Sequence, residues 1–204
     1  MNVVFDFGGV LFRWQPHEFM QRLLPHVASD DASAHSLVQR FFEGFGGDWG
    51  EFDRGTVAAP ELARRIAQRT ALSLADVQNV IDAVPDELQP VLPTMALAQR
   101  LGERGHRLFY LSNMPSPYAD HLELTHDFIA GFEAGVFSSR VQLVKPEPAI
   151  FSHALNAFGI EARDTLLIDD LLANTEAARE AGWQALHFHD AAQCEAELVL
   201  RGLL

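Results

Sequence analysis

Four short stretches of the chain carry side chains that can do chemistry together. Three of them follow directly on apolar runs of the kind that form buried strands. Their reactive residues are Asp6 in VVFDFGGVL, Ser112 and Asn113 in LFYLSN, Lys145 in LVKPEP, and Asp169 and Asp170 in LLIDDLLAN. The set supplies a nucleophilic carboxylate, a hydroxyl donor, a cation and a carboxylate for a divalent metal. This combination is suited to phosphoryl transfer onto an aspartate with the help of Mg²⁺.

Each stretch taken alone has a simpler explanation. Asp6 would serve equally to cap the element after the first strand, and Ser112–Asn113 would suit a turn or a helix cap. A lone lysine such as Lys145 is normally solvated. The Asp169–Asp170 pair is harder to explain in this way, because adjacent carboxylates repel each other unless a cation or several donors hold them. The order of all four stretches is therefore more specific than any one of them.

The apolar runs before these residues predict a parallel sheet. Such runs, bounded by Gly, Asn or Asp, occur at 2–6, 107–111, 165–168 and 184–188, with a weaker one at 134–138. Between them lie helical patterns at 88–104, 147–158 and 172–181, and each ends close to a glycine. Strands that alternate with helices predict a doubly wound, Rossmann-like α/β fold, in which ligands bind beyond the carboxyl ends of the strands. The polar residues that follow the strands are expected at that edge.

Residues 15–87 show a different pattern. They contain no convincing strand, and apolar residues recur at helical spacing in FMQRLL, LVQRFF, LARRIA and VQNVI. We therefore predict an α/β core formed by residues 1–14 and 88–204 and a helical-bundle cap formed by residues 15–87. A cap that emerges at the edge carrying the reactive residues is placed to cover the site and exclude water.

Composition and charge limit the class of protein. A chain of 204 residues with 48% hydrophobic and 21% charged residues is typical of a soluble globular protein. The formal net charge of −13 disfavours nucleic acid and anionic membrane surfaces as partners. The single Cys194 excludes an internal disulfide and a cysteine-rich zinc site. No apolar stretch reaches the length of a membrane span, and no basic leader precedes the first strand, so we expect a cytoplasmic protein.

The strings FDFGGVL, LSN, VKPEP and IDDLLAN together resemble the motifs of the haloacid dehalogenase superfamily, and the resemblance covers nearly the whole chain. Within it, the chain resembles the group that contains bacterial sugar-1-phosphate phosphatases and the amino-terminal phosphatase domain of soluble epoxide hydrolases. The resemblance implies a Mg²⁺-dependent phosphatase that acts on small phosphorylated metabolites such as sugar phosphates.

The resemblance also implies a role for each matching residue. Asp6 would attack phosphorus and form an aspartyl-phosphate that water then hydrolyses. Ser112, with the backbone or side chain of Asn113, would donate hydrogen bonds to the phosphoryl oxygens. Lys145 would neutralise the phosphoaspartate and hold Asp6 in place.

The implied metal site lies beside the nucleophile. Asp170 would bind Mg²⁺ together with Asp6 and the carbonyl oxygen of Gly8. Asp169 and Asn174 would orient this site through hydrogen bonds.

One position departs from the family pattern. The family usually carries a second aspartate two residues after the nucleophile, where it acts as general acid and base, and this chain has Gly8 there. Some members of the resembling group also have glycine at this position. The substrate then needs a good leaving group, such as a glycosyl 1-phosphate, or a water or a cap residue must supply the proton. His17, Asp53 and Arg54 are the candidate cap residues, and Trp49 would form a wall facing the substrate.

Two rival functions remain at this stage. A haloacid dehalogenase would use Asp6 to attack carbon, but it needs no metal and leaves the Asp169–Asp170 pair unexplained. A binding or regulatory protein with a phosphatase fold would have lost turnover with the second aspartate. Fold alone does not decide between an enzyme and such a protein.

Overall fold

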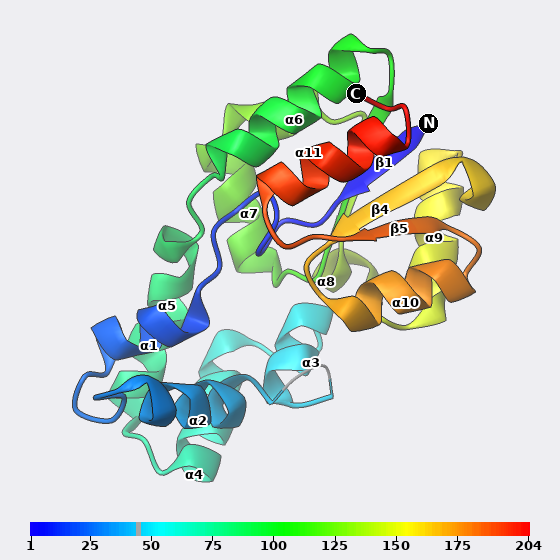
Figure 1. Ribbon diagram of the computed structural model, residues 1–204. Coiled ribbons are helices and arrows are strands. Elements are labelled where there is room, and N and C mark those ends of the chain that lie inside the picture. The colour runs from blue at the N-terminus through cyan, green and yellow to red at the C-terminus, as the bar shows by residue number, and fades with distance from the viewer. Residues whose placement is uncertain (44–45) are drawn as a thin grey trace.

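A five-stranded parallel sheet forms the centre of the protein in the computed structural model, which describes residues 1–43 and 46–204. The strand order is β3-β2-β1-β4-β5 (Figure 1). The strands are β1 (Asn2–Phe5), β2 (Arg107–Ser112), β3 (Ala134–Phe137), β4 (Thr165–Asp169) and β5 (Gln184–His187). All five predicted strands are thus present, and the doubly wound α/β fold is confirmed.

Helices cover both faces of this sheet (Figure 1). One face is covered by α6 (Leu92–Glu103), α7 (Ser116–Thr125) and α11 (Ala191–Leu200), and the other by α9 (Pro148–Phe158) and α10 (Leu172–Glu180). Shorter helical segments are α8 (Ser138–Val141), η1 (Asp127–Gly131) and η2 (Ala162–Asp164). The glycines expected at helix ends are in place: Gly159 caps α9, and Gly105 and Gly182 follow α6 and α10 with positive φ.

The sequence of β1 explains why the sheet needs helices on both faces. Successive side chains of a strand point to opposite faces. Val3 and Phe5 belong to the apolar core on the α6 and α11 side, whereas Val4 belongs to the core on the α9 and α10 side. All three are completely buried. A strand buried on both faces has to be continuously apolar, which is the pattern that predicted it.

The segment 15–87 is helical throughout its described elements and lies at one end of the sheet (Figure 1). Its helices are α1 (Pro16–Leu23), α2 (Asp31–Phe42), α3 (Asp48–Arg54), α4 (Ala59–Thr70) and α5 (Leu74–Glu87). Side-chain caps set two of the starts, because Asp30 accepts from the Ser33 amide at 2.8 Å and Ser73 from the Asp76 amide at 3.0 Å. We call this segment the helical insert.

The two connections between the insert and the sheet run side by side. The amide of Arg13 donates to the carbonyl oxygen of Gln89, and the amide of Val91 donates to that of Leu11. Residues 88–91 therefore lie outside the helices, and α6 begins at Leu92 rather than at 88 as the helical pattern suggested. Pro90 gives the physical reason, because a residue that precedes proline disfavours the helical backbone.

The described helices include none that combines the length and the apolar character required to cross a lipid bilayer.

Candidate active site

The reactive residues meet at the carboxyl ends of three neighbouring strands. Asp6 follows β1, which lies between β2, ending at Ser112, and β4, ending at Asp169. In the register of the sheet, Phe5 lies opposite both Tyr110 of β2 and Ile168 of β4. The sheet edge therefore brings together residues that are more than 100 positions apart in the sequence.

Lys145 is the cation of this cluster and is completely buried. Its Nζ lies 3.0 Å from Oδ1 of Asp6 and 2.6 Å from Oδ2 of Asp169. Burial alone would lower the pKa of this amine, but the two ion pairs outweigh it and raise the pKa above its usual value. Lys145 therefore stays protonated. Its burial rules out the solvated lysine that the sequence alone would allow.

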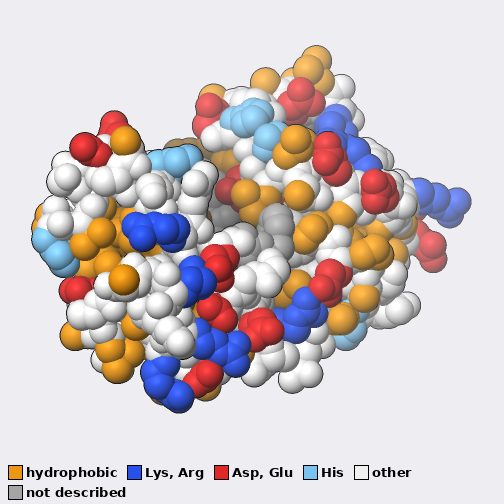
Figure 2. All heavy atoms as spheres, turned by 90° about the horizontal axis from the view of Figure 1, so that it is seen from below, with side chains coloured by type: hydrophobic (Ala, Val, Ile, Leu, Met, Phe, Trp, Pro, Cys, Tyr) orange, Lys and Arg blue, Asp and Glu red, His pale blue; other side chains and the backbone are white. Residues whose placement is uncertain are grey.

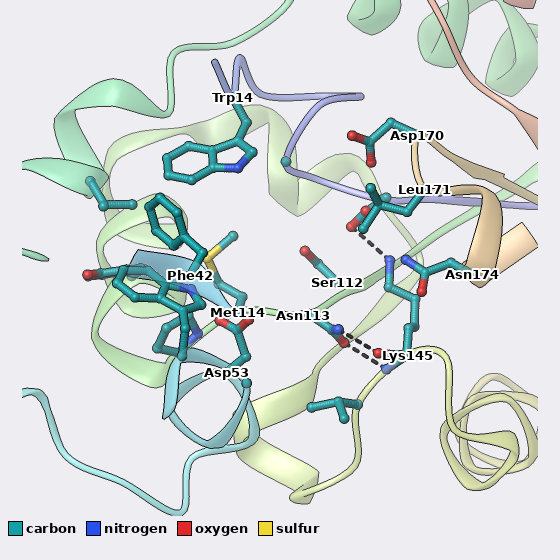
Figure 3. A pocket seen from close by; sticks show the side chains of 18 of the residues that line it. Trp14, Phe42, Asp53, Ser112, Asn113, Met114, Lys145, Asp170, Leu171 and Asn174 are labelled. Atoms are coloured by element: carbon teal, nitrogen blue, oxygen red, sulfur yellow. Dashed lines mark hydrogen bonds and ion pairs between the residues drawn. The ribbon is translucent and has the colours of Figure 1, made fainter. Parts of the chain in front are cut away.

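The side chain of Asn113 holds the backbone of Lys145. Its Nδ2 donates to the Lys145 carbonyl oxygen at 2.9 Å, and its Oδ1 accepts from the Lys145 amide at 2.8 Å (Figure 3). Both polar atoms thus hold the Lys145 backbone, and one N–H of Nδ2 has no hydrogen bond to a described residue. Ser112 differs, because its hydroxyl has no hydrogen bond to any described residue and points into the cavity.

Asp169 is saturated with donors. Its Oδ1 accepts from the Leu171 amide at 2.9 Å and from Nδ2 of Asn174 at 2.9 Å, and its Oδ2 accepts from Lys145. Such a carboxylate positions its neighbours and has little capacity left for a ligand. Asp6 keeps more capacity for a ligand, because only its Oδ1 is engaged. That oxygen pairs with Lys145 and accepts from the Phe7 amide at 2.7 Å.

The site has the charge and the ligands for one divalent cation. Asp6, Asp169 and Asp170 each place a carboxylate oxygen within 4.8 Å of the others. Three carboxylates and the Lys145 ammonium leave a formal charge of minus two. Burial and mutual repulsion raise the pKa of Asp6 to about 7, and burial and Asp169 raise that of Asp170 to about 6. A hard divalent cation, which prefers oxygen ligands, would relieve this repulsion.

Asn174 gives an independent sign of a missing group. Its Oδ1 is buried and has no partner among the described residues, although Asn174 lines the cavity beside Asp170. Buried polar atoms are normally paired. A hydrated cation at Asp170 would supply the absent donor, so the residues present fit Mg²⁺.

Of the two glycines after Asp6, only Gly9 is required by the backbone. Gly9 has a φ of +76°, and a Cβ there would lie 2.3 Å from Oδ2 of Asp170. At Gly8 the nearest atom to an added Cβ is the Cβ of Trp14, at 3.9 Å. Gly9 thus lets the Asp6 loop approach Asp170, whereas Gly8 leaves open space.

We expect Gly9→Ala to weaken Mg²⁺ binding and to lower the free energy of unfolding by about 1 to 3 kcal/mol, because it combines a strained φ with a clash against Asp170. Melting curves recorded with and without Mg²⁺ measure both effects. Gly8→Ala is the matched control and should leave the Mg²⁺-free melting temperature unchanged. Equal behaviour of the two variants would contradict the close approach.

A cavity of about 400 Å³ opens above this cluster, between the sheet edge and the helical insert. The cluster contributes Asp6, Gly8, Ser112, Lys145 and Asp170 to its lining. The rest of the wall is mainly apolar and includes Trp14, Phe42, Trp49, Val84, Leu88, Met114, Tyr118, Val144 and Leu171. Figure 3 shows the aromatic side chains on the side opposite Lys145, and Figure 2 shows the hollow between two lobes of the surface.

Asp53 is the acidic residue that the insert contributes to the cavity. Its carboxyl group makes no hydrogen bond to a described residue, and Figure 3 shows it next to Met114 on the aromatic side. Burial, with a further contribution from the charge of Asp6, raises its pKa to about 8. Asp53 is therefore largely protonated at neutral pH.

The other cap candidates have different positions. Trp49 lines the cavity, as predicted. The structure does not bring His17 there, since His17 is exposed on α1 and its Nε2 lies 3.1 Å from Nδ1 of His35. Arg54 also lies outside the lining, because it pairs with Glu147 and donates to the carbonyl oxygen of Gln142.

Arg54 instead ties the insert to the core beside Asp53. Its partner Glu147 is only two residues beyond Lys145, and the Ser138 hydroxyl donates to the Asp53 carbonyl oxygen. These contacts fix the end of α3 over the site.

Sequence reasoning missed most of the apolar wall. Trp14, Phe42, Leu88 and Tyr118 read as ordinary core residues, and the lining combines several separate elements. The one available signal was local, because Met114 directly follows the LSN stretch, whose residues were already assigned to the site, and Tyr118 lies five residues beyond it.

Comparison with known proteins places these residues in a family context. The chain is 25% identical to the sesquiterpene phosphatase astK of Aspergillus oryzae over 188 residues, which are 92% of this chain and 89% of that protein. The structure of the HAD family enzyme bt-2542 from Bacteroides thetaiotaomicron, in complex with magnesium and inorganic phosphate, superposes with a TM-score of 0.69. Its identity is 21%, over 91% of this chain and 92% of that one.

A dehalogenase structure has a similar fold, with a TM-score of 0.68 at 18% identity over 90% of this chain and 82% of that chain. At such identities the structures show the fold alone. The family model of haloacid dehalogenase-like hydrolases matches residues 1–182, which is most of the chain. The protein is therefore a member of the haloacid dehalogenase-like hydrolase family.

Proposed function

We propose that the protein is a Mg²⁺-dependent phosphomonoesterase that uses Asp6 as its nucleophile. The observation that supports this proposal most strongly is the buried Lys145 between Asp6 and Asp169. Asp170 and the Ser112 hydroxyl lie at the same sheet edge. Phosphoryl transfer needs fixed cations and donors around the phosphoryl oxygens, and this arrangement offers both.

The reaction has two steps on Asp6. In the first, a carboxylate oxygen of Asp6 bonds to phosphorus while the bond from phosphorus to the ester oxygen breaks, which releases the alcohol. In the second, water attacks the aspartyl-phosphate and restores Asp6 with release of inorganic phosphate. Lys145 and the Ser112 hydroxyl stabilise the phosphoryl oxygens in both steps. Asp6, Asp170 and the carbonyl oxygen of Gly8 would hold Mg²⁺, which would supply fixed positive charge near the phosphoryl oxygens.

Asp53 supplies the proton that the Gly8 position lacks. The leaving alcohol departs on the side of the phosphoryl group opposite Asp6, toward the insert, and Asp53 is the described acid of the insert that lines the cavity. Its raised pKa keeps the carboxyl group protonated at neutral pH, so it can donate to the ester oxygen. In the second step the resulting carboxylate can accept a proton from the attacking water.

The helical insert, residues 15–87, acts as a cap over the core formed by residues 1–14 and 88–204. It contributes Asp53 and much of the apolar wall, and it limits the entry of water to the cluster. The name of the similar sesquiterpene phosphatase supports a phosphorylated organic metabolite as the substrate. The sugar phosphates considered from sequence remain one class of candidate.

Dehalogenation is the alternative supported by the similar fold of a dehalogenase. The cluster of three carboxylates argues against it, because attack of Asp6 on carbon needs no divalent cation and gains nothing from the repulsion that the cluster creates.

Removal of the metal tests the proposal. We expect EDTA to abolish phosphate release from p-nitrophenyl phosphate and added Mg²⁺ to restore it, because the phosphoryl oxygens lose a fixed charge. Chloride release from 2-chloropropionate is measured in the same samples. Metal-independent chloride release would establish the dehalogenase instead. Mg²⁺ binding without release of either product would support a binding or regulatory protein.

A further inference from the structure

We propose that the cavity selects phosphate esters of apolar alcohols and discriminates against sugar phosphates. This inference rests on the proposed phosphatase function and names the substrate class of the same site. It follows from the wall of the cavity, from the polar groups that the wall leaves free, and from the residues at the mouth.

The wall facing the reactive cluster is apolar and largely aromatic. Trp14 and Phe42 meet edge to face with ring centroids 5.5 Å apart, and Phe42 and Trp49 do the same at 4.6 Å. Leu88 and Met114 extend this surface. Aromatic and aliphatic walls of this kind bind ligands through buried apolar area.

The polar groups of the cavity are mostly committed elsewhere. The Tyr118 hydroxyl donates to the Ile81 carbonyl oxygen at 2.7 Å, away from a ligand. Both polar atoms of the Asn113 side chain hold the Lys145 backbone. In the proposed reaction Ser112 serves the phosphoryl group and Asp53 the ester oxygen. The indole N–H groups of Trp14 and Trp49 and the second N–H of Asn113 have no hydrogen bond to a described residue, but they are too few for the several hydroxyls of a sugar ring. Most of these hydroxyls would be buried without partners, and each unpaired group weakens binding by roughly tenfold.

The mouth of the cavity is apolar as well. Leu171 lines it and is 43% exposed, and Leu172 beside it is 51% exposed. Both residues follow directly on Asp170, so an apolar chain can leave the reactive cluster along a surface that the core itself provides. A cavity of about 400 Å³ is within the usual range for small-molecule sites, so it has room for a medium-sized alcohol, of roughly ten carbons, beside the phosphoryl group.

Binding to Asp6→Asn in the presence of Mg²⁺ tests the selectivity without turnover. Calorimetry compares methyl, butyl, octyl and decyl phosphate with glucose 1-phosphate. We expect affinity to rise about three- to fourfold per methylene until the wall is filled, and glucose 1-phosphate to bind no more tightly than methyl phosphate. Geranyl and 2-phenylethyl phosphate then distinguish isoprenoid and aromatic alcohols from straight chains. Tighter binding of glucose 1-phosphate than of octyl phosphate, or no dependence on chain length, would overturn the inference.

Leu171→Asn and Leu172→Asn form a matched pair in the same background, because the two leucines are adjacent and similarly exposed but only Leu171 lines the cavity. We expect Leu171→Asn to reduce the ratio of decyl to methyl phosphate affinity about fivefold or more, and Leu172→Asn to leave that ratio unchanged. An equal effect of both variants would show that the apolar chain of the substrate does not leave the cavity along Leu171.

Turnover of acetyl phosphate by the wild-type protein is measured in parallel, because acetate needs no proton to leave and fills little of the cavity. Its absence would refute the phosphatase function, whereas the chain-length series decides the selectivity in either case.

Discussion

Asp6→Asn is expected to lower phosphate release by on the order of 10⁴-fold or more, because the substitution removes the oxygen that forms the bond to phosphorus. The effect should be equal for p-nitrophenyl phosphate and acetyl phosphate, since both reactions would pass through the same aspartyl-phosphate. Initial rates of phosphate release, measured with saturating Mg²⁺, give the comparison. Acid-quenched protein from a labelled substrate should carry phosphate in the wild type and none in the variant.

The folded state should tolerate this change. Lys145 keeps its pair with Asp169 at 2.6 Å, so loss of the Asp6 charge does not leave the buried ammonium alone. The substitution also removes one of three mutually repelling carboxylates. Asp164→Asn provides the control, because that side chain is 59% exposed at the opposite end of β4. Activity of Asp6→Asn within tenfold of this control would eliminate Asp6 as the nucleophile.

The fold could be predicted from sequence because the sheet is buried on both faces. Continuous apolar runs such as 2–6 and 165–168 then have one interpretation, and glycines with positive φ, such as Gly159, mark the helix ends. The exception shows the limit of periodicity. Apolar spacing extended the helix at 92–103 back to 88, where pairing with the chain at 11–13 instead keeps the backbone out of the helix.

The reactive cluster was accessible for a similar reason. Residues that follow parallel strands are brought to one edge by the topology, so Asp6, Ser112 and Asp169 could be grouped without knowing a side-chain direction. The hydrogen-bond partners of these side chains could not be predicted in this way. The sequence does not show that the Asn113 side chain holds the Lys145 backbone, because this depends on two hydrogen bonds between residues 32 positions apart.

The contribution of the insert was least predictable. Asp53 and Arg54 are neighbours on α3, yet Asp53 lines the cavity while Arg54 pairs with Glu147 of the core. Helical periodicity separates their directions but does not say which one faces the site, because that depends on how α3 docks. The docking rests on contacts between segments about 90 residues apart, such as that of Arg54 with Gln142.

Asp53→Asn is expected to lower kcat/KM for octyl phosphate by about 10²- to 10⁴-fold, the usual contribution of a general acid. Acetyl phosphate should be far less affected, because its leaving group departs without a proton. A merely structural role would reduce both rates equally. Asp82→Asn is the control, since Asp82 is an exposed acid on α5 of the same insert.

The pH dependence gives a second, independent measurement. Asp53 donates only when protonated and its pKa is raised to about 8, so wild-type turnover of octyl phosphate should fall as pH rises through that value. This decline should be absent from Asp53→Asn. Wild-type stability should also fall with rising pH, over a range that begins lower. The folded state holds a proton that the unfolded chain releases near pH 4, so wild-type stability declines as pH rises from about 4 to 8.

Asp53→Asn removes that cost and should therefore be more stable than the wild type at pH 8, by a few kcal/mol at most. A variant that loses turnover while gaining stability has lost a functional group rather than its fold. Introducing Gly8→Asp into Asp53→Asn should restore part of the octyl phosphate activity, because position 8 has room for a side chain next to the nucleophile. Equal losses for both substrates, with no recovery from Gly8→Asp, would show that the proton comes from a source other than the insert.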